Sequence, residues 1–504
     1  MSVFGTGLRR ICGVAAASTA QELTKLVGLA VKETPTVELR LDWLRDDSER
    51  TKFLDWLKRK KFKSVTFIAT CRRRTGGGEL AGNAEAELYW LMRARDAGCQ
   101  WCDLEVETLR ELPQQSVRGY AVPSKVMLSM HDFRGTPKVL KKVSLPFAGG
   151  CDAVKIAAMS QTIADSGRLL KVARESKQLV AVPMGEVGLP ARILGLREGS
   201  ALAYAPVAAA TAPGQVGLLE LKKLYRAHEL TRKTAVYGVI GNPIGHSLSP
   251  LMHNTGYVAE RRDAVFLPFL VERLKDFLQI IPQFGVRGFS VTLPHKESVF
   301  RELDDCEVLA QKIGAINTVT VRHDGSLYGS NTDYLGVLRA LEKKIALRGK
   351  RVLIFGAGGA ARAAAFAVAT AGAEVLVCAR REQAARSLAK AVKGGVVNRA
   401  SLRREKFDVI VNATPVGMHP QDGISPLAPG ELNCSFVFDL VYRPMQTKLL
   451  RMAAAKGLQT ISGVEMFVAQ GIAQWEGWMK QKAPEAEMRK AVMGALKAKE
   501  HKLR

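Results

Sequence analysis

The chain has 504 residues, which is too long for one hydrophobic core and predicts two to four domains. Its composition, 47% hydrophobic and 24% charged, is that of a globular protein, and no apolar run approaches the ~18 residues that a membrane span needs. The formal net charge of +26 is spread along the chain without a long basic tail. This favours a basic surface and anionic small substrates over a nucleic-acid or membrane partner.

Cysteine usage points to a reducing compartment. Eight cysteines in a chain of this length do not form a disulfide framework. Cys99 and Cys102 form a CxxC pair, but no second Cys or His pair follows at a spacing suited to zinc, so we expect no metal site. The amino terminus resembles a first strand more than the apolar segment of a signal peptide, and we expect a cytoplasmic protein.

The first 220 residues alternate β-rich runs with amphipathic helical segments such as 84–98 and 164–176. We expect eight strands, at 11–17, 36–44, 64–71, 101–107, 125–133, 152–159, 178–185 and 201–207. Eight strands with crossover helices in this length predict a (β/α)8 barrel. The active site of that fold lies at the carboxyl ends of the strands.

Polar side chains inside these apolar strands indicate where the chemistry lies. They are Glu38, Arg40 and Asp42 in the second strand, Arg72 after the third, Asp103 and Glu105 in the fourth, His131 in the fifth and Lys155 in the sixth. Burial favours the neutral, nucleophilic amine, so Lys155 is a candidate Schiff-base lysine with His131 as its general acid/base. Taken singly, a snorkelling lysine and a hydrogen-bonded core histidine explain the two residues equally well.

The segments ELRLDWL, LSMHDF, AVKIAAM, MGEVGLPARILG and TAPGQVG resemble those of type I 3-dehydroquinate dehydratases, across residues 9–225. The resemblance implies an enzyme that forms an imine with the ketone of 3-dehydroquinate and eliminates water to give 3-dehydroshikimate. It implies Lys155 as the imine-forming lysine and His131 as the proton shuttle. It also implies substrate contacts at Glu38, Arg40, Arg72, Arg192, Thr211 and Gln215, with Arg192 as a clamp for the substrate carboxylate.

At one position the sequence departs from this family pattern. The family usually has a glutamate just before the Gly-Gly that follows the third-strand arginine, beside the catalytic histidine. Gly76 stands there in this chain. Either Glu79 or Glu105 replaces the missing carboxylate, or His131 is oriented differently.

Residues 218–234 are expected to form the last barrel helix and a short basic linker, and a second domain begins after them. Its first strand is AVYGVIG, and the following loop carries Ser247 and Ser249, although Ser249 is also suited to capping the next helix. Lys296 ends a later strand, and Asp333 lies on a neighbouring loop. Such a pair is suited to proton transfer, with a simple salt bridge as the alternative.

The segment 351–381 predicts half of a dinucleotide-binding fold. A strand at 352–355 is followed by a glycine-rich turn, an alanine-rich helix, and a second strand at 374–378. The glycines let the backbone approach a pyrophosphate, and the helix amino terminus holds it. Arg380 and Arg381 follow the second strand, where an NAD-binding protein has an acidic residue. We therefore expect NADP.

The motifs GNPIGHSLSP, GFSVTLPHK, IGAINT, NTDYLG, GAGGAARA, NATPVGM, FDLVYRP and GVEMFVAQG resemble those of shikimate dehydrogenases along residues 235–480. The resemblance implies Lys296 as catalytic acid/base with Asp333 as its partner. The implied shikimate contacts are Ser247, Ser249, Thr292, Asn317, Asp333, Tyr442 and Gln470, and the implied cofactor contacts are Gly356, Ala357, Gly358, Gly359, Ala360, Arg380, Arg381, Leu440 and Gly463. Two departures are Ser290 for the commoner asparagine of GFNVT, and CARR for the usual Asn-Arg-Thr/Ser.

Together the two halves predict an α/β chain that catalyses two successive steps, dehydration of 3-dehydroquinate and NADPH-dependent reduction of 3-dehydroshikimate to shikimate. We expect a barrel at 1–225, a substrate lobe at 235–338, a Rossmann lobe at 339–460, and helices at 461–504 that pack back on the substrate lobe. Two alternatives are a quinate dehydrogenase that uses NAD in the second half, and a basic nucleic-acid-binding protein with degenerate sites. The sequence leaves the oligomeric state open and is compatible with a monomer.

Overall fold

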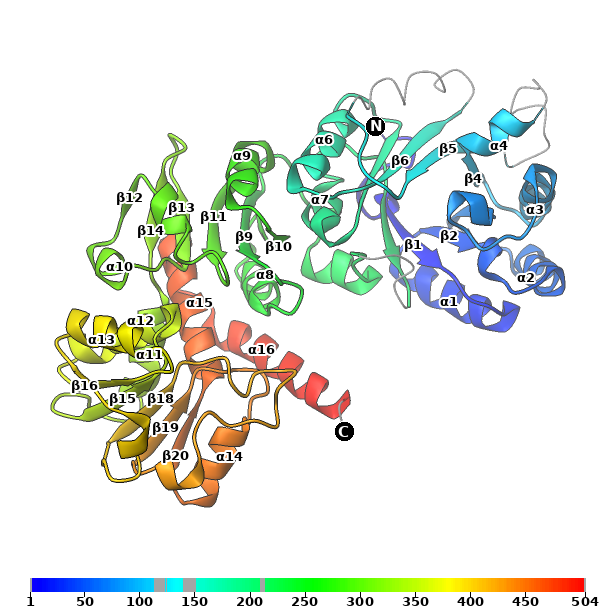
Figure 1. Ribbon diagram of the computed structural model, residues 1–504. Helices are drawn as coiled ribbons and strands as arrows, with labels where there is room; N and C mark the ends of the chain where they lie inside the picture. The colour runs from blue at the N-terminus through cyan, green and yellow to red at the C-terminus, as the bar shows by residue number, and fades with distance from the viewer. Residues whose placement is uncertain (1, 113–122, 124, 139–150, 209–213, 503–504) are drawn as a thin grey trace. The chain divides into compact units, whose positions relative to one another are not determined.

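The computed structural model describes residues 2–112, 123, 125–138, 151–208 and 214–502 (Figure 1). The chain divides into two compact units. One consists of Met1–Thr234 with Pro268–Phe284, and the other of Ala235–Leu267 with Gly285–Arg504. Among the residues described, no helix is long and apolar enough to cross a membrane.

The first unit is built on eight parallel strands, in the order β7-β6-β5-β4-β3-β2-β1-β8. They are β1 (Ile11–Ala15), β2 (Thr36–Arg40), β3 (Thr66–Thr70), β4 (Trp101–Glu105), β5 (Lys125–Asp132), β6 (Ala153–Met159), β7 (Leu179–Met184) and β8 (Ala203–Pro206). The amide of Ala201 donates to the carbonyl of Leu179 at 2.7 Å, which joins β7 to the segment before β8. The expected (β/α)8 barrel is confirmed, with each strand inside its predicted range.

Helices lie outside this sheet (Figure 1). They are α1 (Ala20–Glu33), α2 (Asp47–Lys60), α3 (Ala84–Asp96), α4 (Val106–Glu111), α6 (Ile163–Ala173) and α7 (Leu189–Leu194). Four of them begin after a side-chain cap that satisfies a first-turn amide, from Thr19, Asp46, Asn83 and Thr162. The helix expected within 218–234 is short: it covers residues 218–224, of which η6 (Glu220–Leu224) is a π-helical turn.

Strand alternation divides the barrel residues into three sets. Outward residues such as Leu39 and Phe67 pack in the core formed with α1, α2 and α3. Inward residues at the amino ends of the strands form an apolar floor that includes Ile68, Trp101 and Met127. Two residues further along the same strands come Thr70, Asp103 and Ser129, with Lys155 two residues after Ala153. The polar layer therefore lies above an apolar floor, toward the carboxyl ends of the strands.

The first unit also takes in α9 (Leu274–Phe284). The side-chain amide of Gln283 donates to the carbonyl of Gly167 in α6. Arg197 Nη1 donates to the carbonyl of Phe284 at 2.8 Å. These two hydrogen bonds fix the carboxyl end of α9 within this unit.

The second unit contains two sheets. A mixed sheet has the order β10-β9-β11-β13-β14-β12, and an all-parallel sheet has the order β17-β16-β15-β18-β19-β20. The strands of the mixed sheet are β9 (Ala235–Gly241), β10 (Ala264–Leu270), β11 (Val286–Val291), β12 (Asp305–Cys306), β13 (Thr318–Val321) and β14 (Leu327–Ser330). The strands of the parallel sheet are β15 (Arg351–Phe355), β16 (Glu374–Cys378), β17 (Gly395–Val396), β18 (Val409–Asn412), β19 (Phe436–Asp439) and β20 (Gln459–Ser462).

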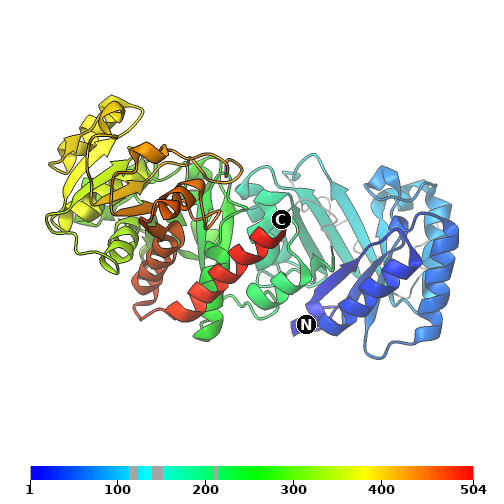
Figure 2. The same cartoon turned by 90° about the horizontal axis from the view of Figure 1, so that it is seen from below.

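The remaining helices are α8 (Ser249–Ala259), α10 (Val308–Ile313), α11 (Asp333–Glu342), α12 (Gly359–Thr370), α13 (Glu382–Ala391), α14 (Lys448–Ala455), α15 (Gly463–Met479) and α16 (Glu485–Lys502). Alternate residues of β15 point to opposite faces of the parallel sheet. Val352 and Ile354 join one core with α11, α12 and α13, whereas Leu353 and Phe355 join another with α14. Figure 2 shows the last helix, α16 (red), which packs on α8 where Met488 lies next to Gly256.

Two candidate active sites

Lys155 sits in the polar layer of the barrel and is held by Asp103. Its Nζ donates to the Asp103 carboxylate, and their side chains are 5% and 0% exposed. The Ser129 hydroxyl also donates to Asp103, and Arg72 Nη2 lies 3.3 Å from it. Burial alone would raise the pKa of Asp103, but the charges of Lys155 and Arg72 outweigh it and hold that pKa below its ordinary value.

His131 lies in the same layer, on the strand between Asp103 and Lys155. Its Nδ1 is 3.1 Å from Oε2 of Glu105, and Glu105 also accepts from Arg72 Nε at 2.6 Å. Burial and the neighbouring charges of Arg72 and Lys155 lower the pKa of His131 well below its ordinary value. Burial raises the pKa of Glu105 to about 7. A neutral imidazole whose Nδ1 is engaged has Nε2 available as a base.

The three predicted substrate arginines differ in their partners. Arg40 donates to both carboxylate oxygens of Asp42, at 3.0 and 2.7 Å, and Arg72 is shared by two carboxylates. Arg192 on α7 donates to the carbonyl of Pro183, and it has no carboxylate partner in the part of the chain that the structure describes. Burial lowers the pKa of Arg192 to about 10. Of the three arginines, Arg192 is therefore the one whose positive charge is available to bind an anionic ligand.

Other predicted barrel residues lie around this layer. Glu38 accepts a hydrogen bond from the Thr70 hydroxyl at 2.7 Å. The ring of Tyr204, which the sequence did not indicate, lies 5.0 Å from Lys155 Nζ and covers it from β8. Gln215 is half-buried, and Thr211 lies outside the described residues.

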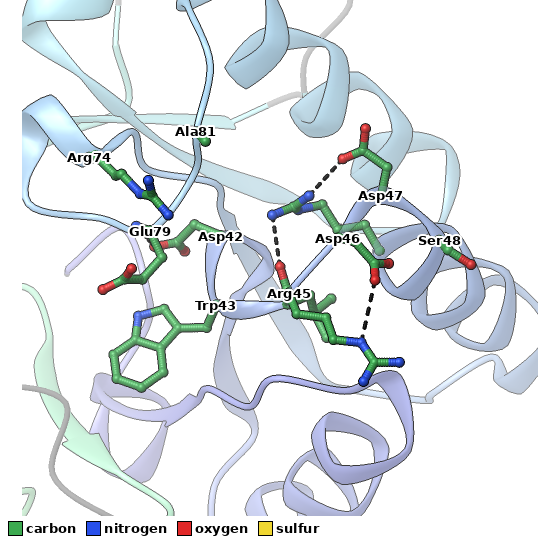
Figure 3. Close-up of a pocket in the computed structure, with 11 residues that line it drawn as sticks. Asp42, Trp43, Arg45, Asp46, Asp47, Ser48, Arg74, Glu79 and Ala81 are labelled. Atoms are coloured by element: carbon green, nitrogen blue, oxygen red, sulfur yellow. Dashed lines mark hydrogen bonds and ion pairs between the residues drawn. The ribbon is translucent and has the colours of Figure 1, made fainter.

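A pocket of about 740 Å³ opens beside the ends of β2 and β3 (Figure 3). Asp42, Trp43, Arg74 and Glu79 line one side of it. The backbone amide of Glu79 donates to Asp42 at 3.2 Å, so Glu79 lies at the rim of this pocket. Of the two carboxylates considered as replacements at Gly76, Glu105 is the one that contacts His131.

In the second unit, Lys296 and Asp333 form the expected pair. Lys296 follows β11, Asp333 opens α11, and Nζ lies 2.5 Å from Asp333 Oδ2. Their side chains are 19% and 7% exposed. Asn317 Nδ2 donates to the other carboxylate oxygen at 2.8 Å. The carbonyl of Lys296 accepts from the amide of Ile316, which ties the lysine to the loop that carries Asn317.

Neutral groups extend this arrangement into the core. Asn317 Oδ1 accepts from the Thr318 hydroxyl at 2.9 Å, and that hydroxyl accepts from Gln474 Nε2 at 3.1 Å. Gln474 Oε1 in turn lies 3.3 Å from Nε2 of His253, which is fully buried and stacked on Phe266. Burial lowers the pKa of His253 to about 4. The Lys296 and Asp333 pair is thus oriented by amides and hydroxyls instead of further charges.

The other predicted shikimate contacts lie on nearby loops and on α15. The hydroxyl of Ser247 accepts from the amide of Ser249, and Leu248, with no side-chain cap, precedes α8, so Ser249 does not cap this helix. The ring of Tyr442 stacks on Phe467 with centroids 4.6 Å apart. Gln470 donates to the Phe467 carbonyl at 2.8 Å, Thr292 is half-buried, and Ser290 donates to the carbonyl of Gly238 at 3.4 Å.

The glycine turn after β15 has the geometry of a phosphate cradle. Gly356 has φ +126°, and a Cβ there would lie 3.1 Å from the carbonyl oxygen of Ala413. Gly358 precedes α12 without a side-chain cap, which leaves the first-turn amides of Gly359 and Ala360 free of a competing side chain. A Cβ on Gly359 would lie 3.8 Å from Lys296 Cδ. The amino end of α12 therefore lies beside Lys296, and Ala357, which is half-buried, lies in the turn between β15 and α12.

The remaining predicted cofactor residues fit the same site. Arg380 and Arg381 are exposed after β16 and form no ion pair with any described residue. The strand order reverses between β15 and β18, which places the ligand crevice of such a sheet at their carboxyl ends. A Cβ on Gly463 would lie 2.5 Å from the carbonyl oxygen of Leu440, so only glycine permits this approach. The residues present fit a dinucleotide with a 2′-phosphate.

Several functional neighbours were not assigned a role from the sequence. The sequence indicated Asp103 as a polar residue inside an apolar strand, but not that it holds Lys155. Ser129 and Tyr204 follow from the period-2 pattern of the strands once the barrel is closed. Gln474 and His253 lie on apolar helices, and no local pattern distinguishes them from ordinary core residues.

Comparison with known families identifies the two halves of the chain. Three family models match: type I 3-dehydroquinase over residues 11–232, the shikimate dehydrogenase substrate binding domain over 239–319, and the shikimate 5′-dehydrogenase C-terminal domain over 463–493. A bifunctional 3-dehydroquinate dehydratase/shikimate dehydrogenase of Arabidopsis thaliana, described as chloroplastic, is 33% identical over 473 residues. That alignment covers 89% of this chain and 78% of the relative.

Single-function relatives match the second half alone. An NADP(+) shikimate dehydrogenase of Methanosarcina acetivorans is 40% identical over 277 residues, which cover 52% of this chain and 99% of the relative. A solved shikimate dehydrogenase in complex with NADP+ is 33% identical, with a TM-score of 0.50, and the match covers 53% of this chain and 97% of that one.

Proposed function

Since this chain belongs to the family of bifunctional 3-dehydroquinate dehydratases/shikimate dehydrogenases, we propose the residues by which each of its two sites works. The barrel dehydrates 3-dehydroquinate to 3-dehydroshikimate, and the second unit reduces that ketone to shikimate with NADPH. The observation that carries the proposal is a lysine and aspartate pair at each site, one in the barrel layer and one beside the glycine turn.

In the barrel, Lys155 is the nucleophile. Its amine adds to the substrate ketone and water leaves, which gives an imine that draws electrons from the adjacent carbon. His131, neutral because of its burial, takes the proton from that carbon and returns it to the departing hydroxyl, which leaves as water. Hydrolysis of the imine then frees the product and Lys155. Asp103 balances the charge of the lysine while its amine is protonated.

Glu105 orients His131 in place of the residue missing at position 76. The support is the contact between Glu105 and Nδ1 of His131. A Cβ on Gly76 would lie 3.4 Å from Glu105 Cγ and from Arg72 Cγ, so a longer side chain there would compete for the space that Glu105 and Arg72 fill. The absence of a side chain at position 76 therefore leaves the space from which Glu105 contacts His131.

Arg192 binds the carboxylate of 3-dehydroquinate. Arg192 is half-buried and has no acidic partner among the described residues, so an anionic substrate supplies the negative charge that the protein does not. Glu38, Arg40, Arg72, Thr211 and Gln215 complete the substrate contacts. We expect Arg192→Met to raise the KM for 3-dehydroquinate by about 10²-fold, measured against Arg174→Met, whose guanidinium pairs with Glu198 in the same unit.

In the second unit, Lys296 exchanges a proton with the C3 oxygen of the substrate, which is the ketone oxygen of 3-dehydroshikimate, and Asp333 holds its ammonium in place. NADPH, when bound, supplies the hydride. Its pyrophosphate is held by the turn at Gly356 to Ala360 and its 2′-phosphate by Arg380 and Arg381. Shikimate contacts come from Ser247, Ser249, Thr292, Asn317, Tyr442 and Gln470, with Leu440 and Gly463 lining the nicotinamide side.

We also propose the cytoplasm as the site of action, supported by the cysteine content, because eight cysteines in a chain of this length do not form a disulfide framework. Activity in a cell fraction separated from organelles and membranes tests this location. The four-part division of the chain at residues 225, 338 and 460 stays a prediction, as does a monomer, and sedimentation measures the latter.

The deciding experiment supplies 3-dehydroquinate and NADPH to the whole chain and follows shikimate. Lys155→Ala is expected to stop shikimate formation from 3-dehydroquinate but not from 3-dehydroshikimate, and Lys296→Ala to accumulate 3-dehydroshikimate. Borohydride added with 3-dehydroshikimate is expected to mark the wild-type chain and Lys171→Ala, an exposed control on α6, but not Lys155→Ala. Formation of 3-dehydroshikimate at the wild-type rate by Lys155→Ala contradicts the imine assignment.

A further inference from the structure

A buried carboxylate that contacts neither lysine lies at the carboxyl end of β19. Asp439 is fully buried and accepts three hydrogen bonds, from Asn412 Nδ2 at 2.9 Å, the amide of Val441 at 3.1 Å and the Thr447 hydroxyl at 2.6 Å. No cation is among its partners in the described residues. Burial raises its pKa to about 6. A buried carboxylate without a cation is costly, and three donors are the compensation that retains it.

The three donors belong to two different loops, residues 412–418 and 440–447. Asn412 also accepts from the amide and the hydroxyl of Thr414, at 3.0 and 2.7 Å, which folds the 412–418 loop over the end of β18. Thr447 ends the 440–447 loop and caps α14 by accepting from Leu450 at 3.2 Å. One carboxylate thus fixes the start of one loop and both ends of the other.

These two loops form one side of the nucleotide crevice. The parallel sheet runs β16-β15-β18-β19, with the 2′-phosphate arginines after β16 and the pyrophosphate turn after β15. The nicotinamide end of the cofactor must then extend over β18 and β19. A Cβ on Gly356 would lie 3.2 Å from Thr414 Cγ2, and a Cβ on Gly463 would lie 2.5 Å from Leu440 O, so both loops touch the cofactor glycines.

We propose that Asp439 is a positioning residue of the reductase, which holds the 412–418 and 440–447 loops as the wall against which the nicotinamide ring of NADP(H) packs. It touches neither the hydride nor the substrate and acts through Asn412, Val441 and Thr447. This role rests on the cofactor site proposed above. It predicts a loss of affinity at the nicotinamide end of the cofactor and none at the adenosine end.

The test compares two ligands on the whole chain, NADP+ and adenosine 2′,5′-bisphosphate, which lacks the nicotinamide. Thr447→Val keeps the shape of the side chain and removes its hydroxyl, and Asp439→Asn replaces the acceptor. Both are expected to raise the Kd for NADP+ and the KM for NADPH about tenfold, with the Kd for the bisphosphate changed less than twofold. Thr447→Ser, which keeps the hydroxyl, is expected to restore both values. Retained binding of the bisphosphate by the same samples shows that the lobe which carries Asp439 is folded.

Unchanged NADP+ binding in both variants overturns the proposal. Equal weakening of NADP+ and the bisphosphate also overturns it, because Asp439 would then support the whole lobe instead of the nicotinamide wall. The cofactor site itself is tested separately by the double variant of Arg380→Ala and Arg381→Ala. If that variant binds the bisphosphate as tightly as wild type, the site assignment fails, whatever the Asp439 variants do.

Discussion

Lys155 with Asp103 and Lys296 with Asp333 are the same kind of ion pair in two different surroundings. The barrel pair is 5% and 0% exposed and shares its carboxylate with Arg72, next to Glu105 and His131. The pair in the second unit is 19% and 7% exposed, and its further partners are amides and hydroxyls. One lysine lies among charges, whereas the other is oriented by neutral hydrogen bonds.

The difference matches the two reactions. A lysine that attacks a ketone must lose its proton and later carry positive charge as an iminium, so it needs a carboxylate to balance it and a neutral base nearby. In the mechanism that we propose, Asp103 and His131 supply these. A lysine that exchanges a single proton with a hydroxyl needs only one carboxylate in a fixed position. The network from Asn317 to Gln474 fixes Asp333 without adding a charge that would compete for Lys296.

The largest difference between the pairs is expected on removal of the aspartate charge. Asp103→Asn leaves Lys155 and Arg72 buried without their shared carboxylate, which is expected to lower the free energy of unfolding of the barrel unit by about 3–5 kcal/mol. Asp333→Asn leaves Lys296 partly exposed to water, and we expect a loss of about 1 kcal/mol or less. Urea unfolding of the full chain measures both, with hydrogen exchange in peptides from each unit marking its own transition.

Similar losses in the two variants would contradict the comparison, because they would mean that the surroundings of the pairs do not matter. The unaffected unit serves as the control in each case. Asp103→Asn is expected to leave the reductase transition in place, and Asp333→Asn to leave the dehydratase transition in place.

A smaller effect is expected at the buried end of the neutral network. The imidazole of His253, with its pKa lowered to about 4, stays neutral in the folded chain, whereas in the unfolded chain it takes up a proton below about 6.5. Its contribution is therefore fully present above pH 6.5 and is lost as the pH falls from 6.5 to about 4, by up to about 3 kcal/mol. His253→Phe, which keeps an aromatic ring on Phe266, is expected to flatten this dependence in urea unfolding of the reductase unit.

His323→Phe, at an exposed turn of the same unit, is the matched control and is expected to keep the wild-type dependence on pH. If both variants lose stability in acid as the wild type does, His253 is not the group responsible. The acid sensitivity would then belong to other groups of the unit.

Much of the fold follows from the sequence because it rests on local patterns. The eight barrel strands are apolar runs separated by helical segments, and the turn at Gly356 lies between a strand and a helix as the pattern requires. The inward direction of Lys155 and His131 follows from alternation along each strand. A period of two residues is a local property, so one sequence suffices to read it.

The side-chain partners that the sequence did not predict depend on contacts between segments that are distant in the chain. Which carboxylate holds Lys155 is decided by the closing of the barrel, which brings β4 to within reach of β6. Whether Glu79 or Glu105 contacts His131 depends on the path of the loop after β3. Gln474 reaches Thr318 across more than a hundred residues of chain. Such pairings leave no periodic trace in the sequence.

The smallest expected effect concerns the choice between Glu79 and Glu105. Ionised Glu105 accepts from Nδ1 of His131 and so leaves Nε2 as the base. Because burial raises the pKa of Glu105 to about 7, dehydratase kcat is expected to rise as the pH passes through about 7. Glu105→Gln removes the titrating group, so this rise is expected to disappear and kcat above pH 8 to fall by about tenfold. Glu79→Gln, at the rim, is expected to keep the wild-type profile, and a lost rise in that variant instead would assign the orienting role to Glu79.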